Sequence, residues 1–205
     1  MKYKKLFLTV LFLLAILAGT TAHVTAKQKA DPLQPEIAAK ILRFHVLANS
    51  DSDEDQAVKL QVRDAVGHLM EEKLKGAKSR KETEKIVENN MEEIIKTAEV
   101  ALQKNGYTYG ASAKLKDVDF PVKTYGNYTF PAGKYRALQI TLGEGKGHNW
   151  WCVLYPNMCF QGSVYEVVDD EADHALREVL TQAEYADVFN SGKVEVRWKI
   201  LEYFR

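Results

Sequence analysis

The feature that most constrains the fold is a change in apolar spacing near residue 106 of this 205-residue chain. Between residues 58 and 101 apolar side chains recur every three or four positions, as in Val58, Val62 and Ala65, which is typical of an amphipathic helix. From Tyr107 onward the spacing is two, which is typical of a half-buried strand. Helices followed by strands predict an α+β fold, with the helices packed on one side of a mostly antiparallel sheet.

Local signals set the bounds that we expect for the elements. Capping residues predict that one helix begins at Ser52 or Asp53, and glycines mark where helices end. The glycine-rich run Gly143–Gly147 separates two predicted strands, so we expect a hairpin loop there. The expected strands are 41–48, 107–115, 135–142, 150–155 and 194–201, and the expected helices are 52–76, 79–105 and 169–185.

The first residues resemble an export signal. Three lysines precede an apolar run of about 13 residues, Leu6–Ala18, which is shorter than the roughly 20 residues that a membrane-spanning helix needs. Small residues at Val24 and Ala26 offer a cleavage site, with Thr20 and Ala22 as an alternative. We therefore expect a signal peptide over 1–26, a linker over 27–38 and a single domain over 39–205. An uncleaved membrane anchor remains the alternative.

The charge balance argues against a nucleic-acid partner. The chain carries 28 basic and 28 acidic residues, and the first 26 residues hold three of the lysines and no acid. The exported part therefore has 25 basic and 28 acidic residues, whereas nucleic-acid binding needs a basic excess on one face.

No motif in the sequence predicts a metal or cofactor. Asp51, Asp53 and Asp55 resemble the start of a calcium loop, but the glycine and glutamate of that template are replaced by Gln56 and Val62. The glycine-rich run leads into a strand and not into the helix that a phosphate-binding loop requires. We therefore expect no cofactor.

The two cysteines and two adjacent tryptophans allow more than one interpretation. Cys152 and Cys159 flank a turn, so an exported chain could join them in a disulfide, or both could be buried thiols. Trp150 and Trp151 must face opposite sides of a strand. Both could be core residues, or one could contact a partner.

Three blocks of the sequence together resemble the stage II sporulation protein R family of endospore-forming bacteria. They lie in residues 43–64, 128–135 and 143–160, and the third, with its alternate glycines followed by Asn149-Trp150-Trp151-Cys152, is the most specific. The resemblance covers nearly all of the exported part.

The resemblance implies a signalling protein and not an enzyme. Members of the family are secreted from the forespore into the space between the forespore and mother-cell membranes. There they activate a membrane-embedded aspartic protease of the mother cell, which leads to processing of the mother-cell sigma factor precursor. The implied partner is the extracytoplasmic face of that protease, and no small-molecule substrate is implied.

We expect the partner contact to involve the turn after the first strand, with arginine and tryptophan anchors because such residues dominate interfaces. The competing hypothesis is a secreted hydrolase of cell wall or peptide, with His45 and Asp51 as its acid–base pair. The candidate contact residues are Arg43, Asn49, Asp51, Asp55, Arg63, Trp150 and Trp151.

Overall fold

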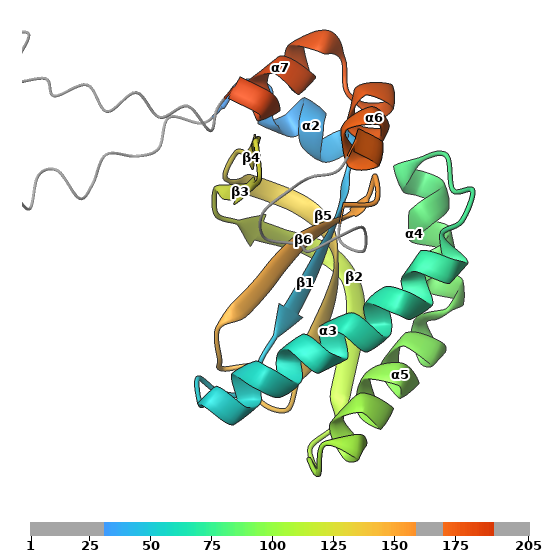
Figure 1. Cartoon of the computed structure of the whole chain (residues 1–205), viewed down its shortest axis with the longest axis vertical. Coiled ribbons are helices and arrows are strands. Elements are labelled where there is room, and N and C mark those ends of the chain that lie inside the picture. Colours follow the sequence, from blue (N-terminus) through green and yellow to red (C-terminus); the bar gives the residue numbers. More distant parts are fainter. Residues whose placement is uncertain (1–30, 159–169, 191–205) are drawn as a thin grey trace, which may run out of the picture. The chain divides into compact units, whose positions relative to one another are not determined.

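A four-stranded sheet in the order β2–β5–β1–β6 lies at the centre of the computed structural model, which describes residues 31–158 and 170–190 (Figure 1). β1 is parallel to β5 and antiparallel to β6, and β2 is antiparallel to β5. The α+β class and the mostly antiparallel sheet confirm the prediction. The strands are β1 (Leu42–Leu47), β2 (Ala111–Phe120), β5 (Gly133–Leu142) and β6 (Asn149–Tyr155).

Three helices pack on one face of this sheet. Ser52 and Ser79 cap α3 and α4, because each side-chain oxygen accepts the backbone N–H three residues later. The apolar stripes of the helices bury alternate residues of β1, including Phe44, in one hydrophobic cluster. These helices are α3 (Asp53–Lys73), α4 (Arg80–Asn89) and α5 (Met91–Lys104).

A second hydrophobic cluster forms on the opposite face of the sheet. It joins Val153 of the sheet to Ile37, Phe130, Leu176 and Val188, which come from three short helices and a hairpin. We did not expect this additional partial layer of helices. Its elements are α2 (Gln34–Lys40), α6 (Asp170–Val179), α7 (Gln182–Asn190) and the hairpin β3 (Lys123–Tyr125)–β4 (Tyr128–Phe130).

Arg43 of β1 is completely buried within this second cluster. Its guanidinium carbon lies 4.4 Å from the ring centroid of Phe120 and 5.1 Å from that of Phe130. Nη2 donates a hydrogen bond of 3.1 Å to the hydroxyl of Tyr125. Burial lowers the pKa of Arg43, although Tyr125 and Tyr135 oppose this effect. Aromatic faces attract the cation, so Arg43 ties the β3–β4 hairpin to the sheet.

Several element bounds differ from those that we expected. The helix expected over 79–105 is interrupted at Asn90, whose side-chain amide donates to the carbonyl oxygen of Ile86 at 2.7 Å and ends α4. Part of the expected linker is α2, in which Ile37 is fully buried. The strand expected from Tyr107 begins at Ala111.

The prediction of a hairpin loop at Gly143–Gly147 is wrong. β5 and β6 are not neighbours in the sheet, because β1 lies between them, so this run must cross the end of β1. The expected signal peptide and the expected strand over 194–201 lie outside the described residues and stay predictions. In the described part of the chain, no helix is both long and apolar enough to cross a membrane.

Phe44 provides a test of the packing between β1 and the helices. Its side chain is fully buried and contacts the ring of Trp150 edge-on at 5.5 Å. We expect Phe44→Ala to lower the free energy of unfolding by about 3–5 kcal/mol, measured by urea denaturation, because a large cavity remains. The control is Val100→Ala, whose side chain is 38% exposed and which should change stability by less than about 0.5 kcal/mol. Equal losses in the two variants would contradict the assigned core.

Candidate functional site

The turn between β1 and α3, residues 49–55, is organised around the carboxylate of Asp55. This carboxylate accepts hydrogen bonds from Asn49 Nδ2 at 2.8 Å, Ser50 Oγ at 2.5 Å and the hydroxyl of Tyr109 at 2.6 Å. Asp55 is only 6% exposed, so these bonds replace the water that it loses on folding. We call residues 49–55 the Asp55 turn.

The hydrogen bonds decide the charge state of Asp55. Burial on its own would raise the pKa of this carboxyl, but the bonds from Ser50, Tyr109 and Asn49 outweigh burial and lower the pKa below its usual value of 3.8. Burial and the bond to Asp55 raise the pKa of Tyr109. Asp55 is therefore a carboxylate at neutral pH, and Tyr109 remains a neutral donor.

The segment from Gly143 to His148, which we call the glycine loop, crosses the end of β1 and forms hydrogen bonds with the Asp55 turn. The backbone N–H of Lys146 donates to the carbonyl oxygen of Asn49, and that of Gly147 donates to the carbonyl oxygen of Ala48, both at 3.0 Å. The loop therefore continues the backbone pairing beyond the last residue of β1.

Side chains of the Asp55 turn also hold the glycine loop. Asn49 Oδ1 accepts the backbone N–H of Glu144 at 2.9 Å, and Asp51 Oδ1 accepts that of His148 at 2.6 Å. Asn49 thus bonds the loop through its oxygen and Asp55 through its nitrogen. The turn and the loop, more than 90 residues apart in the chain, form one junction.

Two glycines are required by this close approach. A Cβ atom at Gly147 would lie 2.0 Å from the carbonyl oxygen of Ser50, which is a backbone atom and cannot rotate away. Gly143 has φ +53°, and a Cβ there would lie 2.2 Å from Asn49 Oδ1. Gly143 and Gly147 therefore serve the contact with the turn.

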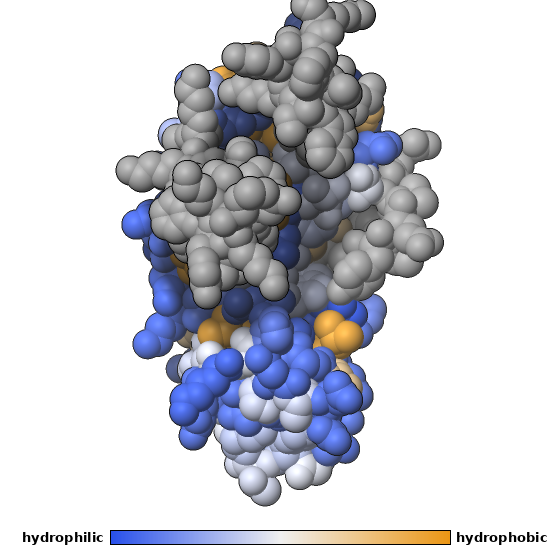
Figure 2. All heavy atoms as spheres, turned by 90° about the vertical axis from the view of Figure 1, so that its left-hand side faces the viewer, coloured by the Kyte–Doolittle hydropathy of each residue, from blue (hydrophilic) through white to orange (hydrophobic). Residues whose placement is uncertain are grey.

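The outer surface of this junction is acidic. Four of its carboxylates are exposed to solvent; Lys146 pairs with Glu144, and His148 lies beside Asp51. The start of α3 points toward the face shown in Figure 2, and the lower half of that face is largely hydrophilic. We call this set the acidic tip: Asp51, Asp53, Glu54 and Glu144.

The structure divides the predicted contact residues of the turn region into buried and exposed groups. Arg43 is fully buried, which removes its guanidinium from any surface that a partner can touch in this conformation. Asn49 and Asp55 hold the junction together from inside. Asp51 is exposed and belongs to the acidic tip.

The tryptophans face opposite sides of β6. Trp150 is 6% exposed and packs on the helical side, where the guanidinium of Arg63 lies 5.1 Å from its ring centroid. Arg63 leaves only 14% of its side chain exposed. Trp151 is half-buried and stacks on His45 with ring centroids 3.9 Å apart. Of these three predicted contact residues, Trp150 is buried, whereas Arg63 and Trp151 are each partly exposed.

His45 and Asp51 form hydrogen bonds with different residues. His45 Nε2 lies 2.7 Å from Asn149 Oδ1, whereas Asp51 Oδ1 lies 2.5 Å from His148 Nδ1. Burial lowers the pKa of His45 to about 4, so the ring is neutral at neutral pH. The structure therefore does not bring together the acid–base pair of the hydrolase hypothesis.

Two further features complete the comparison with the sequence. Cys152 is buried, but Cys159 lies outside the described residues, so their disulfide stays a prediction. Sequence analysis missed Tyr109 and Asn149 as parts of the site, and no local pattern distinguishes them from ordinary strand residues. Within residues 31–158 and 170–190, no cluster of three or more histidine, cysteine or acidic side chains could hold a metal ion.

Comparison with known proteins agrees with the resemblance described above. The family model for stage II sporulation protein R matches residues 38–165, a range that contains both the Asp55 turn and the glycine loop. The chain is also 33% identical over 189 residues to stage II sporulation protein R of Bacillus subtilis (strain 168). That alignment spans 90% of this chain and 84% of the relative. No solved structure gives a significant match.

Removing the charge of Asp55 tests whether its carboxylate stabilises the turn. We expect Asp55→Asn to lower the free energy of unfolding at pH 7 by about 1.5–3 kcal/mol, because the buried donors lose a charged acceptor. The pKa of this carboxyl is lower in the folded protein, so its stabilisation is complete above about pH 4 and disappears as the pH falls through the folded value. Urea denaturation of wild type and variant between pH 7 and pH 3 should show the difference shrinking.

The matched control for this change is Asp64→Asn. Asp64 leaves 55% of its side chain exposed, and its only described partner is the neighbouring Arg63. This variant should lose less than about 0.5 kcal/mol. A similar loss at both positions, or a loss at Asp55 that does not depend on pH, would show that the carboxylate does not organise the turn.

Adding one methyl group at Gly147 tests the close contact between the glycine loop and the Asp55 turn. We expect Gly147→Ala to cost about 1–3 kcal/mol in thermal or urea unfolding, because the Cβ meets the Ser50 backbone. Gly110→Ala is the control, since its Cβ would lie 3.4 Å from a side-chain atom of Glu99, an ordinary contact. If both alanines were tolerated equally, the loop could not lie where the structure places it.

Proposed function

Because the chain belongs to the stage II sporulation protein R family, we propose that it is a secreted signal that activates a membrane-embedded aspartic protease of the mother cell. Membership of the family supports a role at stage II of sporulation. Activation of the protease would lead to processing of the mother-cell sigma factor precursor. The chain would act between the forespore and mother-cell membranes, as its expected signal peptide over residues 1–26 suggests.

One structural observation supports an action by contact. The Asp55 turn and the glycine loop meet in a junction that is hydrogen-bonded on its inside and presents four carboxylates on its outside. A surface held in one shape loses little entropy when it binds. A bound signal shifts its receptor only if it has higher affinity for the active state, and a fixed charged surface can provide that difference.

No described contact favours the competing hydrolase. His45 bonds to Asn149, and Asp51 bonds to His148, so the two side chains do not share a proton-transfer contact. General acid–base catalysis requires such groups to converge on one substrate. We therefore propose a signalling protein without enzymatic activity of its own.

Reversing charge at the acidic tip tests the proposed contact between the tip and the protease. We expect Asp53→Lys/Glu54→Lys in the full chain to reduce processing of the sigma factor precursor by about tenfold, because attraction to the protease becomes repulsion. The measurement is the ratio of mature sigma factor to precursor in sporulating cells that lack the wild-type chain. The level of exported protein is measured in the same cells.

The matched control reverses Glu92 and Glu93 to lysine. These residues are also exposed acids in the first turn of a helix, α5, so their reversal has the same unfavourable effect on the helix dipole. Reversal of Glu93 also breaks its ion pair with Lys73, so the control perturbs the fold at least as much as the test variant does. Cells that carry this control variant should process the precursor at the wild-type rate. Equal activity in both double variants would argue against the acidic tip as the contact, whereas normal processing in cells without the chain would refute the proposed function itself.

A further inference from the structure

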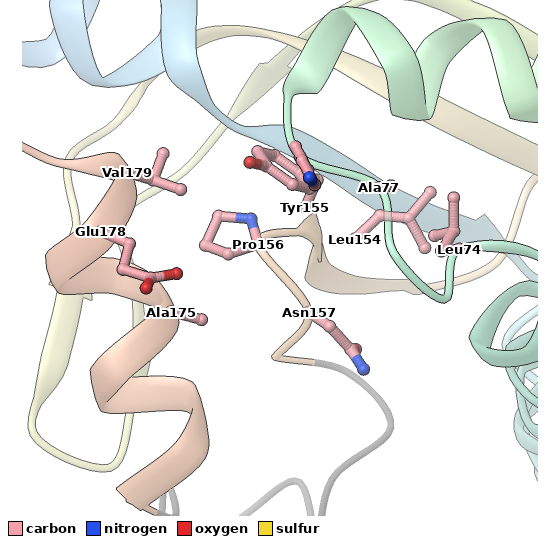
Figure 3. Close-up of a pocket in the computed structure, with 10 residues that line it drawn as sticks. Leu74, Ala77, Leu154, Tyr155, Pro156, Asn157, Ala175, Glu178 and Val179 are labelled. Atoms are coloured by element: carbon pink, nitrogen blue, oxygen red, sulfur yellow. The ribbon is translucent and has the colours of Figure 1, made fainter.

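The central sheet has two edge strands, β6 and β2, which differ in their surroundings. The end of β6 lies between α6 and the connection from α3 to α4, with a hollow of about 560 Å³ between these two walls (Figure 3). β2 is ten residues long, and in the described part of the chain only β5 pairs with it. A long edge strand with open backbone groups is a template for a further strand.

Half of the residues of β2 direct their backbone groups away from the sheet. The register of β2 and β5 pairs Ala111 with Leu142, so Gly110 faces Gly143, and the N–H of Gly143 donates to the carbonyl oxygen of Gly110 at 2.9 Å. Bonded and non-bonded pairs alternate along an antiparallel ladder, so the even-numbered residues of β2 bond to β5. The odd-numbered residues therefore point N–H and C=O outward, and no hydrogen bond reaches these groups from the residues that the structure describes.

The side chains of β2 carry charges in a fixed order. Lys114 and Lys116 lie on one face of the sheet, Asp117 and Asp119 lie on the other, and all four are exposed. Asp117 has a distant partner, Arg136, at 3.8 Å, but leaves 62% of its side chain exposed. A strand added at this edge therefore fits only if its charges match this order.

A second copy of the chain does not match this order. We considered two copies of β2 paired antiparallel with their helices on the same side of the joined sheet. Every register that aligns most of the strand then brings like charges directly opposite each other, either lysines (Lys114, Lys116) or aspartates (Asp117, Asp119). Like charges in that position destabilise a strand pair, so the edge favours a different sequence.

The C-terminal part of the sequence carries matching charges. Residues 194–201, which we expected to form a strand, are followed by Glu202 and Tyr203. One antiparallel register joins opposite charges at three positions, which are Lys199 with Asp117, Arg197 with Asp119, and Glu202 with Lys114. On the inner side β5 already places Arg136 and Lys134 opposite the two aspartates. Each of these carboxylates would therefore lie between two cations.

The same register also joins apolar side chains. The three pairs are Val196 with Phe120, Trp198 with Val118, and Leu201 with Leu115. Val118 is only partly buried against the second cluster, and Leu115 is only partly buried against the helical one. Trp198 and Leu201 would cover these two side chains, which stabilises the pairing by removing apolar surface from water.

The chain between α7 and this register is long enough to reach β2. α7 ends at Asn190, and its Val188 belongs to the same cluster as Phe120, the last residue of β2. Residues 191–195 connect α7 to Val196, and an extended chain of this length spans roughly 17 Å. A strand that begins opposite Phe120 must then run antiparallel to β2, as the charge pattern requires.

We propose that residues 196–203 form a fifth strand of the sheet, antiparallel to β2, with Lys199 opposite Asp117. This strand would close the exposed edge and hold α7 against the sheet. The inference is independent of the proposed signalling function. It concerns a segment outside residues 38–165, the range that the family model matches.

Disulfide trapping in the full chain tests the register. Lys114 and Glu202 form a non-hydrogen-bonded pair in this register, with Cα atoms about 4.5 Å apart, which suits a disulfide. Lys114→Cys/Glu202→Cys should therefore form this bond at least about tenfold faster than the control Lys114→Cys/Glu195→Cys, whose second cysteine lies about 23 Å further along the strand. Peptide mapping by mass spectrometry distinguishes the new bond from any bond of the native cysteines, which both variants retain.

Equal rates in the two variants would show a tail that samples both positions, and would overturn the fifth strand. A bond that forms only between two molecules would assign the edge to a second copy, and would overturn it as well.

Hydrogen exchange measures the pairing without new cysteines. The outward amides of Leu115, Asp117 and Asp119 should be protected in the full chain, because strand residues would accept their N–H groups. Lys199→Pro removes a ladder N–H and should speed their exchange by about tenfold, whereas Lys193→Pro, in the connection, should leave it unchanged. Unprotected outward amides in the wild-type chain, or the same exchange in both proline variants, would contradict the proposal.

Discussion

The hydrogen bonds to the carboxylate of Asp55 are the interactions on which the rest of the site depends. It accepts three side-chain hydrogen bonds in a nearly buried position, and one of its donors, Asn49, also binds the glycine loop. Loss of this acceptor would leave buried donors unpaired, which costs more than the bonds contribute on their own. The acidic tip is therefore supported mainly from inside, and of its four exposed carboxylates that of Asp51 also holds the glycine loop.

The two faces of the sheet are stabilised in different ways. The helical face is an apolar cluster around Phe44, whereas the opposite face surrounds the buried cation of Arg43 with aromatic rings. A buried guanidinium needs such compensation for its lost water. Both residues lie on β1, so this short strand connects the two clusters and leads directly into the Asp55 turn.

Local patterns predicted the parts of the fold that local interactions determine. The cap at Ser52, the stripe of α3 and the alternation of β5 are encoded within a few residues, and each is present in the structure. The burial of Arg43 and the path of the glycine loop depend on residues about 80 to 100 positions away. Arginine in a short strand looks like a surface residue until Phe120 and Phe130 enclose it. The glycine-rich run looked like a hairpin loop because strand order is not encoded in the run itself.

The central claim is that this protein changes the activity of a receptor by binding to it. The most direct measurement mixes the purified full chain with the purified protease in a membrane mimic and follows cleavage of the sigma factor precursor. We predict that cleavage requires the protease and accelerates when the chain is added, and that the chain alone leaves the precursor intact. An unchanged rate on adding the chain, or cleavage by the chain without the protease, would contradict the account.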